Sequence, residues 1–189
     1  SQGSRKYENL DQNLTYSGTE DIVKDYQNVN ATSITTGSGN DTLEFQSLNS
    51  KTINSGAGND NVIINQSSSG NTIQLGEGDN SLTIGGSLNQ GTTQAGAGND
   101  IFIVNQGANT TQVNLGNGNN TISIKESLNG SNIATGSGND TLIVGGTSDG
   151  NTISMGAGAD KVQINGNVLD TKIDLGDGID SIQLSFNSN

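Results

Sequence analysis

A glycine-rich motif, Gly-x-Gly-x-Asx, occurs eight times and carries the most regularly placed chemical groups in the chain. The copies begin at Gly37, Gly56, Gly76, Gly96, Gly116, Gly136, Gly156 and Gly176, with one spacing of 19 residues and six of 20. Their Asx residues are Asp41, Asp60, Asn80, Asp100, Asn120, Asp140, Asp160 and Asp180. Alternate glycines allow a tight turn with inward carbonyls, and oxygens facing one another suit a hard cation such as Ca²⁺. The alternative is that Asn and Asp act here only as ordinary turn residues.

Apolar residues keep the same register as the motif and define the elements that must position it. Six and eight residues after the first glycine, every copy carries an apolar side chain. These sixteen residues are Leu43 and Phe45, Val62 and Ile64, Leu82 and Ile84, Phe102 and Val104, Ile122 and Ile124, Leu142 and Val144, Val162 and Ile164, and Ile182 and Leu184. A spacing of two places each pair on one face of a strand.

A second strand is predicted just before each motif, facing the same interior. The residues three positions before the motif are Ile34, Ile53, Ile73, Thr93, Val113, Ile133, Ile153 and Ile173. Two strands and two turns per 20 residues describe one coil of a solenoid, in which stacking makes the core continuous. The sequence therefore predicts an all-β, β-roll-like parallel β-solenoid of about eight coils with one calcium-binding edge.

Composition agrees with a thin, repeated core. Of the 189 residues only 29% are apolar and 3% aromatic, too few to fill a compact core of that size. The net charge of −12 repels phosphate, so we expect no nucleic-acid partner and no binding to anionic membranes. No apolar run approaches the roughly 18 residues of a transmembrane helix, so we expect no membrane insertion. The chain has no cysteine and therefore no disulfide.

A longer period of 40 residues, or two coils, lies on top of the 20-residue repeat. The residue directly before each motif alternates in size through Ser55, Leu75, Ala95, Leu115, Thr135 and Met155, before Leu175 breaks the pattern. A solvent-side strand position alternates between Ile63, Ile103 and Ile143 and the polar Thr83, Ser123 and Gln163. Large and small residues in turn let successive core layers interdigitate, and duplication of a two-coil unit also explains the pattern.

The motif also resembles a known repeat. The chain reads Leu75-Gly76-Glu77-Gly78-Asp79-Asn80-Ser81-Leu82-Thr83 and Thr135-Gly136-Ser137-Gly138-Asn139-Asp140-Thr141-Leu142-Ile143. These stretches resemble the RTX-type (hemolysin-type) calcium-binding nonapeptide, a parallel β-roll family found in bacterial surface-layer proteins and large adhesins. The resemblance covers about residues 34–184. It implies that the Asx side chains and the flanking glycine carbonyls bind several Ca²⁺ ions in one file between adjacent coils.

The glycines that the resemblance assigns to the metal are Gly37, Gly39, Gly56, Gly58, Gly76, Gly78, Gly96, Gly98, Gly116, Gly118, Gly136, Gly138, Gly156, Gly158, Gly176 and Gly178. The chain departs from the family pattern because the first glycine of the nonapeptide is replaced and the motif occurs only once per coil. Asn80 and Asn120 offer a neutral oxygen, so we expect weaker sites beside them. Ala159 and Ile179 replace the usual Asn, which indicates an irregular C-terminal end.

Residues 1–32 lack the motif but contain all three tyrosines of the chain. Solenoids need an atypical end to cover the last apolar layer. We therefore interpret residues 1–32 as an N-terminal cap or connector and residues 33–189 as the RTX-like calcium solenoid. Because the sequence opens at Ser1 without Met, we expect it to be a piece of a longer protein.

Three classes of function are relevant to a sequence of this kind. An enzyme is not expected, because the chain has no histidine or cysteine and its acids recur identically instead of breaking the repeat at one place. Ice binding or carbohydrate binding by an adhesin module is the alternative. The resemblance implies threonine rows for ice binding, yet the residue between the motif glycines is never Thr. A second column, with Thr52, Thr72, Thr92 and Thr152, is interrupted by Gln112 and Asn132 and ends in Lys172.

The third class, a structural module of a secreted bacterial cell-surface protein, fits best. An acidic surface, the lack of cysteine and a rod stabilised by calcium are expected of a surface-layer lattice subunit or an adhesin rod. Similarity to RTX chains implies type I secretion, with folding outside the cell where millimolar Ca²⁺ saturates sites of about 10⁻⁴–10⁻³ M. Partners would then be calcium ions, further copies of the chain in a lattice, or a cell-surface glycan.

Overall fold

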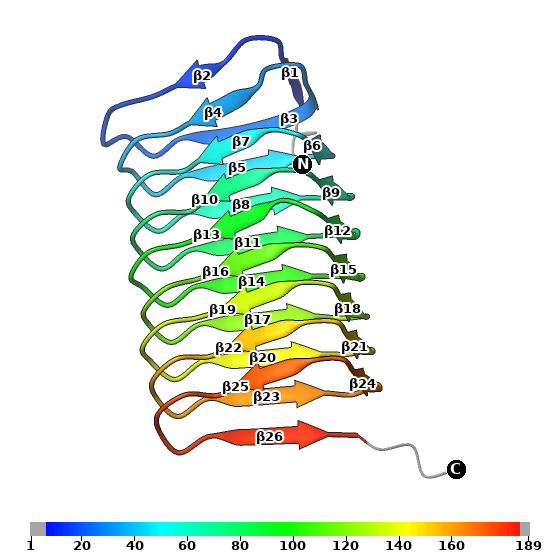
Figure 1. Cartoon of the computed structure of the whole chain (residues 1–189). Coiled ribbons are helices and arrows are strands. Elements are labelled where there is room, and N and C mark those ends of the chain that lie inside the picture. Colours follow the sequence, from blue (N-terminus) through cyan, green and yellow to red (C-terminus); the bar gives the residue numbers. More distant parts are fainter. Residues whose placement is uncertain (1–6, 186–189) are drawn as a thin grey trace, which may run out of the picture.

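The computed structural model describes residues 7–185, which form a rod of stacked parallel strands (Figure 1). The predicted all-β solenoid is confirmed, with about nine turns of about 20 residues. Residues 7–185 contain no helix, and so none that is long and apolar enough to cross a lipid bilayer. Each strand pairs in parallel with its equivalent one coil further on, as in the register Leu82↔Phe102.

Three sheets run the length of the rod. The ten-stranded sheet contains β1 (Glu8–Leu10), β3 (Val23–Val29), β5 (Thr42–Phe45), β8 (Asn61–Ile64), β11 (Ser81–Ile84), β14 (Ile101–Val104), β17 (Thr121–Ile124), β20 (Thr141–Val144), β23 (Lys161–Ile164) and β26 (Ser181–Leu184). The nine-stranded sheet contains β2 (Leu14–Thr15), β4 (Ser33–Thr35), β7 (Thr52–Asn54), β10 (Thr72–Gln74), β13 (Thr92–Gln94), β16 (Gln112–Asn114), β19 (Asn132–Ala134), β22 (Thr152–Ser154) and β25 (Lys172–Asp174).

A third sheet lies where the sequence predicted only a turn. Its seven two-residue strands are β6 (Leu48–Asn49), β9 (Ser68–Ser69), β12 (Leu88–Asn89), β15 (Ala108–Asn109), β18 (Leu128–Asn129), β21 (Ser148–Asp149) and β24 (Val168–Leu169). The far end of each coil is thus extended backbone paired along the rod. The first residue of most of these strands, such as Leu48 or Leu128, is buried and closes the core at that edge.

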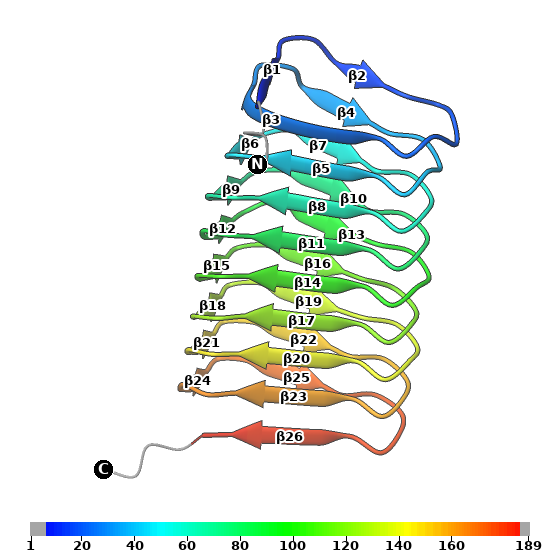
Figure 2. The same ribbon diagram turned by 180° about the vertical axis from the view of Figure 1, so that it is seen from behind.

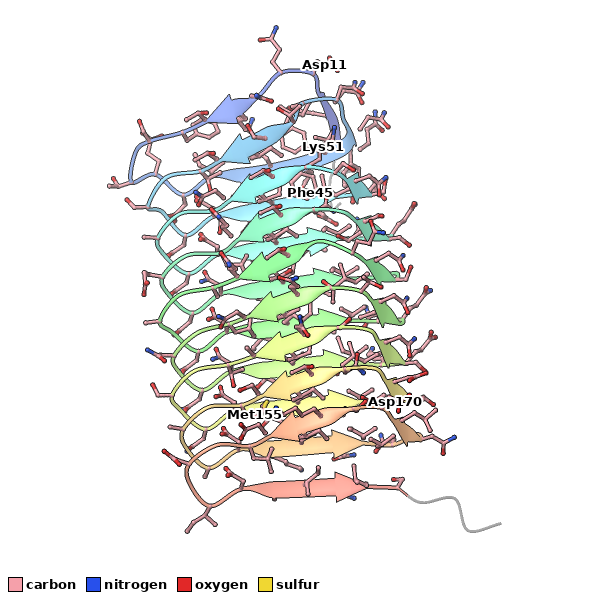
Figure 3. All side chains as sticks on the ribbon, viewed as in Figure 1. Asp11, Phe45, Lys51, Met155 and Asp170 are labelled. Carbon is pink, nitrogen blue, oxygen red and sulfur yellow. The ribbon has the colours of Figure 1, made fainter. Side chains whose placement is uncertain are left out.

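The predicted inward positions form the core. Of the sixteen paired apolar residues, the fourteen up to Ile164 are buried, and so are seven of the eight residues three before the motif. Phe45 and Met155 lie inside the rod, whereas Asp11 and Asp170 lie on its outside (Figure 3). Ile182 differs from the prediction because it is 46% exposed, as no strand covers β26 within the described residues.

The segment predicted as a cap winds in the same way as the rest. Within residues 7–32, β1 and β3 extend the ten-stranded sheet and β2 extends the nine-stranded one; residues 1–6 lie outside the described part. Leu10, Tyr26 and Ala31 are buried, and the Tyr26 ring stacks on Phe45 with centroids 5.9 Å apart. These residues cover the first apolar layer, so the solenoid has more turns than motif copies.

Two coils close the far edge with a buried asparagine in place of a large apolar residue. In β21, Ser148 points inward where the preceding coil has Leu128. The Asn151 amide nitrogen donates to the Leu128 carbonyl at 2.6 Å and to the Ser148 hydroxyl at 2.8 Å, and its oxygen accepts the Ser131 N–H at 2.8 Å. Asn71 makes the same set of bonds four coils earlier. The asparagine therefore fills the volume that a small Ser leaves.

Candidate functional site

The Gly-x-Gly-x-Asx turns connect the nine-stranded sheet to the ten-stranded sheet and lie one above another along a single edge (Figure 2). Their geometry requires glycine. Gly58 has φ +120° and Gly78 has φ +118°, and a Cβ on either would collide with the carbonyl of the equivalent glycine one coil before. Each turn thus packs its backbone directly on the preceding one.

The eight predicted Asx residues form one column, which we call the Asx column. Asp41, Asp60, Asn80, Asp100, Asn120, Asp140 and Asp160 are each at most 2% exposed, and Asp180 is half-buried. From Asp60 onward, each Oδ1 accepts a hydrogen bond from the backbone N–H of the Asx one coil before, for example Asp100 Oδ1 from the Asn80 N–H at 2.9 Å, and Asp41 Oδ1 accepts the Ile22 N–H at 2.8 Å. The column is therefore tied together coil by coil through one oxygen of each side chain.

The second carboxylate oxygen has no partner in five of these residues. Oδ2 is buried without a hydrogen bond in Asp41, Asp60, Asp100, Asp140 and Asp160. A buried polar atom without a partner carries a desolvation cost of about 1–3 kcal/mol, more when it is charged. The five aspartates therefore carry a large desolvation cost, which a cation or a hydrogen-bond donor next to Oδ2 would remove.

The two asparagines identify what surrounds those oxygens. Asn80 uses Oδ1 as the aspartates do, so its Nδ2 occupies the place equivalent to the aspartate Oδ2. That nitrogen donates to the Gly76 carbonyl at 3.1 Å and the Gly78 carbonyl at 3.2 Å. Asn120 makes the same two bonds in its own turn. In the aspartate turns an unpartnered oxygen therefore stands where the asparagines place a donor.

The donor set of an aspartate turn consists only of oxygen. In the turn of Asp100, neither the Gly96 nor the Gly98 carbonyl accepts a hydrogen bond from the described residues. A carboxylate and carbonyl oxygens are the ligands of Ca²⁺, which takes six to eight of them. Within residues 7–185 no three acidic side chains gather closely enough to hold a metal by themselves. Backbone carbonyls, the adjacent coil and water would therefore complete the coordination.

The electrostatics of the column agree with a need for positive charge. Burial raises the pKa of Asp100 to about 6, and the negative charges of Asp79 and Glu77 add to this, while hydrogen bonds from Asn80 oppose it. Burial is also the main reason why the pKa values of Asp60, Asp140 and Asp160 are raised. These carboxylates are thus held in an environment that disfavours their charge unless a cation is close.

A second, outer row of residues follows the turns and was not predicted from the sequence. It consists of Asp21, Asn40, Asn59, Asp79, Asn99, Asn119 and Asn139. Each Oδ1 in this outer row accepts the backbone N–H of the equivalent residue in the following coil, the opposite direction to the Asx column. The regular Asn-Asp pair of the motif could have indicated the row. It ends at Ala159, which has no side-chain acceptor for the Ile179 N–H.

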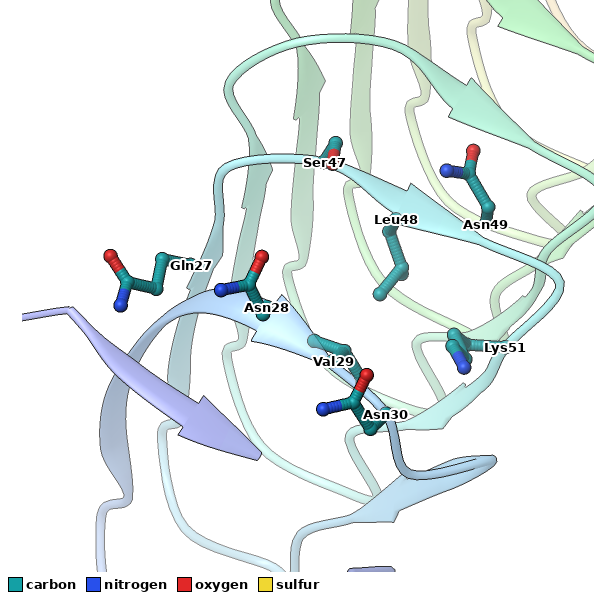
Figure 4. Close-up of a pocket in the computed structure, with 8 residues that line it drawn as sticks. All are labelled: Gln27, Asn28, Val29, Asn30, Ser47, Leu48, Asn49 and Lys51. Carbon is teal, nitrogen blue, oxygen red and sulfur yellow. The ribbon is translucent and has the colours of Figure 1, made fainter. Parts of the chain in front are cut away.

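A shallow polar hollow lies at the opposite edge from the Asx column, beside β6, the first strand of the seven-stranded sheet (Figure 4). Gln27, Asn28, Asn30 and Lys51 line it. The Gln27 and Asn28 amides donate to Asn9, and the Asn30 amide donates to Asp11. These amides are therefore engaged with the first turn of the solenoid.

Comparison of the chain with protein-family models, curated proteins and solved structures gave no match.

Proposed function

We propose that this chain is a calcium-stabilised structural module of a secreted bacterial cell-surface protein, a surface-layer lattice subunit or an adhesin rod. The observation that carries the proposal is the column of five buried aspartates whose Oδ2 atoms have no partner and stand at the place where Asn80 and Asn120 donate to glycine carbonyls. Turn chemistry alone would be served by asparagine at every coil, because its amide completes the same turn without charge.

In this proposal the aspartates and the motif glycines hold the cations. Their Oδ2 atoms and carbonyls would supply part of the coordination from each turn, and the adjacent coil and water would supply the rest. Bound Ca²⁺ would neutralise acids stacked about 4.8 Å apart, which otherwise repel one another along the rod. Folding would then follow calcium, as in metal sites that exist only in the folded state.

The test is a calcium titration of the metal-stripped protein, followed by far-UV circular dichroism and analytical ultracentrifugation. We expect strand content and compaction to appear together as calcium rises towards millimolar concentration. Mg²⁺ at the same concentration should act poorly, because it loses its water reluctantly. Full strand content in EDTA, unchanged by calcium, would contradict the proposal.

Sedimentation in the same experiment separates the two structural roles. An increase in mass at the calcium midpoint favours a lattice subunit, and a monomeric elongated particle favours an adhesin rod. Ile101, 45% exposed, and the half-buried Ile103 lie together on the outer face of β14 and offer one apolar contact for self-association. Catalysis is not proposed, because every acid of the column recurs in the same setting from coil to coil.

Ice or carbohydrate binding remains the alternative proposal. Thr52, Thr72 and Thr92 lie in register on neighbouring strands of the nine-stranded sheet, and Gln112 and Asn132 continue the same row. A glycan array and an ice-recrystallisation assay on the calcium-loaded protein test this. Activity in either assay would move the function from scaffold to binding module.

A further inference from the structure

The Asx column is not uniform, and its variation is coupled to a second position. The residue five positions before each Asx, directly in front of the motif, lies beside the Asx side chain. The hydroxyl groups at this position donate to a carbonyl of the following coil, Ser55 to Leu75 at 3.2 Å and Thr135 to Met155 at 2.7 Å, so they leave the aspartate Oδ2 without a donor. The position five before the Asx therefore differs in size and polarity from coil to coil without supplying a donor to Oδ2.

This neighbouring position follows the choice between acid and amide. Coils with Asp41, Asp60, Asp100 and Asp140 carry a small or hydroxyl-bearing residue there, namely Thr36, Ser55, Ala95 and Thr135. Both asparagine coils carry leucine, Leu75 before Asn80 and Leu115 before Asn120, and both leucines are 0% exposed. The coils of Asp160 and Asp180 have Met155 and Leu175 there, so a large apolar neighbour does not by itself replace the acid.

Backbone carbonyls also differ between the asparagine turns and the aspartate turn of Asp100, although in the turns of Asp140 and Asp160 the first glycine oxygen accepts one N–H, from Ala157 and Asp177. The Gly76 oxygen accepts both the Asn80 amide at 3.1 Å and the Gly96 N–H at 2.8 Å, so both of its lone pairs are used. The Gly116 oxygen is likewise shared by the Asn120 amide and the Gly136 N–H. In the aspartate turn between these two coils, the Gly96 and Gly98 oxygens accept no hydrogen bond from the described residues.

We infer that the cation file is interrupted at Asn80 and Asn120, where the side-chain amide takes the place of the cation and the turn is complete without metal. This inference rests on the proposed calcium function. Cations would then bind in the aspartate turns, and in the middle of the rod the Asp100 turn would stand alone between two metal-free turns. From Asp60 to Asp140 the 40-residue period would alternate a turn closed by a cation with a turn closed by an amide, in addition to alternating large and small residues.

The first test converts a metal turn into an amide turn. Asp100→Asn should lower the calcium content of the loaded protein by one ion per chain, measured by native mass spectrometry. In EDTA the same variant should be more stable than the natural chain, because two new hydrogen bonds replace an unpartnered carboxylate oxygen. Because the natural chain is expected to be largely unfolded in EDTA, both chains are folded there with trimethylamine N-oxide, which strengthens burial. In that solution we expect the melting temperature to rise by roughly 2–12 °C.

Asp79→Asn is the matched control, because it removes the same charge at the adjacent outer position and keeps an acceptor for the Asn99 N–H, as Asn59 does in its coil. It should leave the calcium count unchanged. The reverse test is Asn80→Asp with Leu75→Ser, which copies the pair Asp60 and Ser55. It should gain one ion per chain and lose stability in EDTA, with Asn99→Asp as the control for added charge.

The outcomes separate this inference from the proposed function. If the natural chain binds no calcium, the proposed function fails and the inference fails with it. If the natural chain binds calcium but Asp100→Asn keeps the full count, or loses an ion without becoming more stable in EDTA, the interruption is wrong while the calcium function stands. Should the reverse variant not fold, the Asp100→Asn result alone decides in the same way.

Discussion

Asn151 offers a sharp test of how the far edge of the solenoid is held. The side chain is 2% exposed and makes three hydrogen bonds, two as donor and one as acceptor. Replacing it by serine removes the two donor bonds and leaves the Leu128 carbonyl without the amide donor. The serine hydroxyl can still accept the Ser131 N–H, as Ser131 accepts the Thr111 N–H at 3.0 Å one coil before. At about 1 kcal/mol for each hydrogen bond the loss is roughly 2 kcal/mol. This corresponds to about 4–8 °C in melting temperature for a chain of this size.

A second substitution should restore most of that stability. Ser148→Leu combined with Asn151→Ser copies the arrangement of Leu128 and Ser131 one coil before, in which an apolar side chain fills the edge. Ser148→Leu alone should destabilise by about 1–3 kcal/mol, because the Asn151 amide already lies 2.8 Å from the Ser148 hydroxyl. The two changes are therefore expected to be coupled favourably by at least about 2 kcal/mol.

The measurement is urea unfolding of the four chains of this cycle in saturating calcium, with hydrogen exchange of residues 128–151. Exchange reports the affected coils directly, since a repeat protein can open locally instead of unfolding as one unit. Asn71→Ser is the matched comparison, because Asn71 makes the same contacts in another coil. If the double variant loses the sum of the two single losses, the volume-filling explanation is refuted.

Three further predictions concern the turns. Ala159→Asn extends the outer row by an acceptor for the Ile179 N–H. It should therefore raise the free energy of unfolding by about 0.5–1.5 kcal/mol and slow hydrogen exchange at the Ile179 amide. Unchanged exchange at Ile179 would contradict this prediction. Gly78→Ala should destabilise the calcium-loaded chain by at least about 1–3 kcal/mol. Gly78 has φ +118°, and a Cβ at this position would collide with the Gly58 carbonyl. Circular dichroism melting measures the effect, and an unchanged melting temperature would show that the turn relaxes freely. In metal-free protein the pKa of Asp100 is raised from 3.8 to about 6, so its protonated form favours folding: the strand content of the metal-free chain should be highest below about pH 4 and decrease as the pH rises through 6. Far-UV circular dichroism measures this, and strand content that increases over that range would be the opposite of this expectation.

Much of the fold could be predicted because one register controls both the motif and the core. The apolar residues at fixed distances from each glycine motif are inside as expected, from Leu43 to Ile164. The third sheet was missed because its strands have only two residues and no constant residue type, from Leu48–Asn49 to Val168–Leu169. The number of turns was underestimated because residues 7–32 wind without the motif.

The candidate site was predictable as a set of residues but not as a set of bonds. Spacing alone indicates that Asp100 and its equivalents lie in a column. It does not reveal that one oxygen of each is already used by a backbone N–H, nor that the amide of Asn80 closes its turn through two glycine carbonyls. From the sequence, the size alternation at Ser55 and Leu75 indicates core packing or duplication of a two-coil unit, and its relation to acid and amide depends on hydrogen bonds that spacing does not reveal.

The coil-to-coil pairing of all three sheets also determines how the rod would respond to force. Because each strand pairs only with its equivalents in adjacent coils, the backbone hydrogen bonds between strands run along the rod, and tension on its ends would load the terminal coil first. Each detached coil of about 20 residues releases roughly 66–72 Å of extended chain in place of about 4.8 Å of rod. A stretched molecule would therefore lengthen in equal steps and dissipate mechanical work coil by coil, as an extensible tether between two anchored points does.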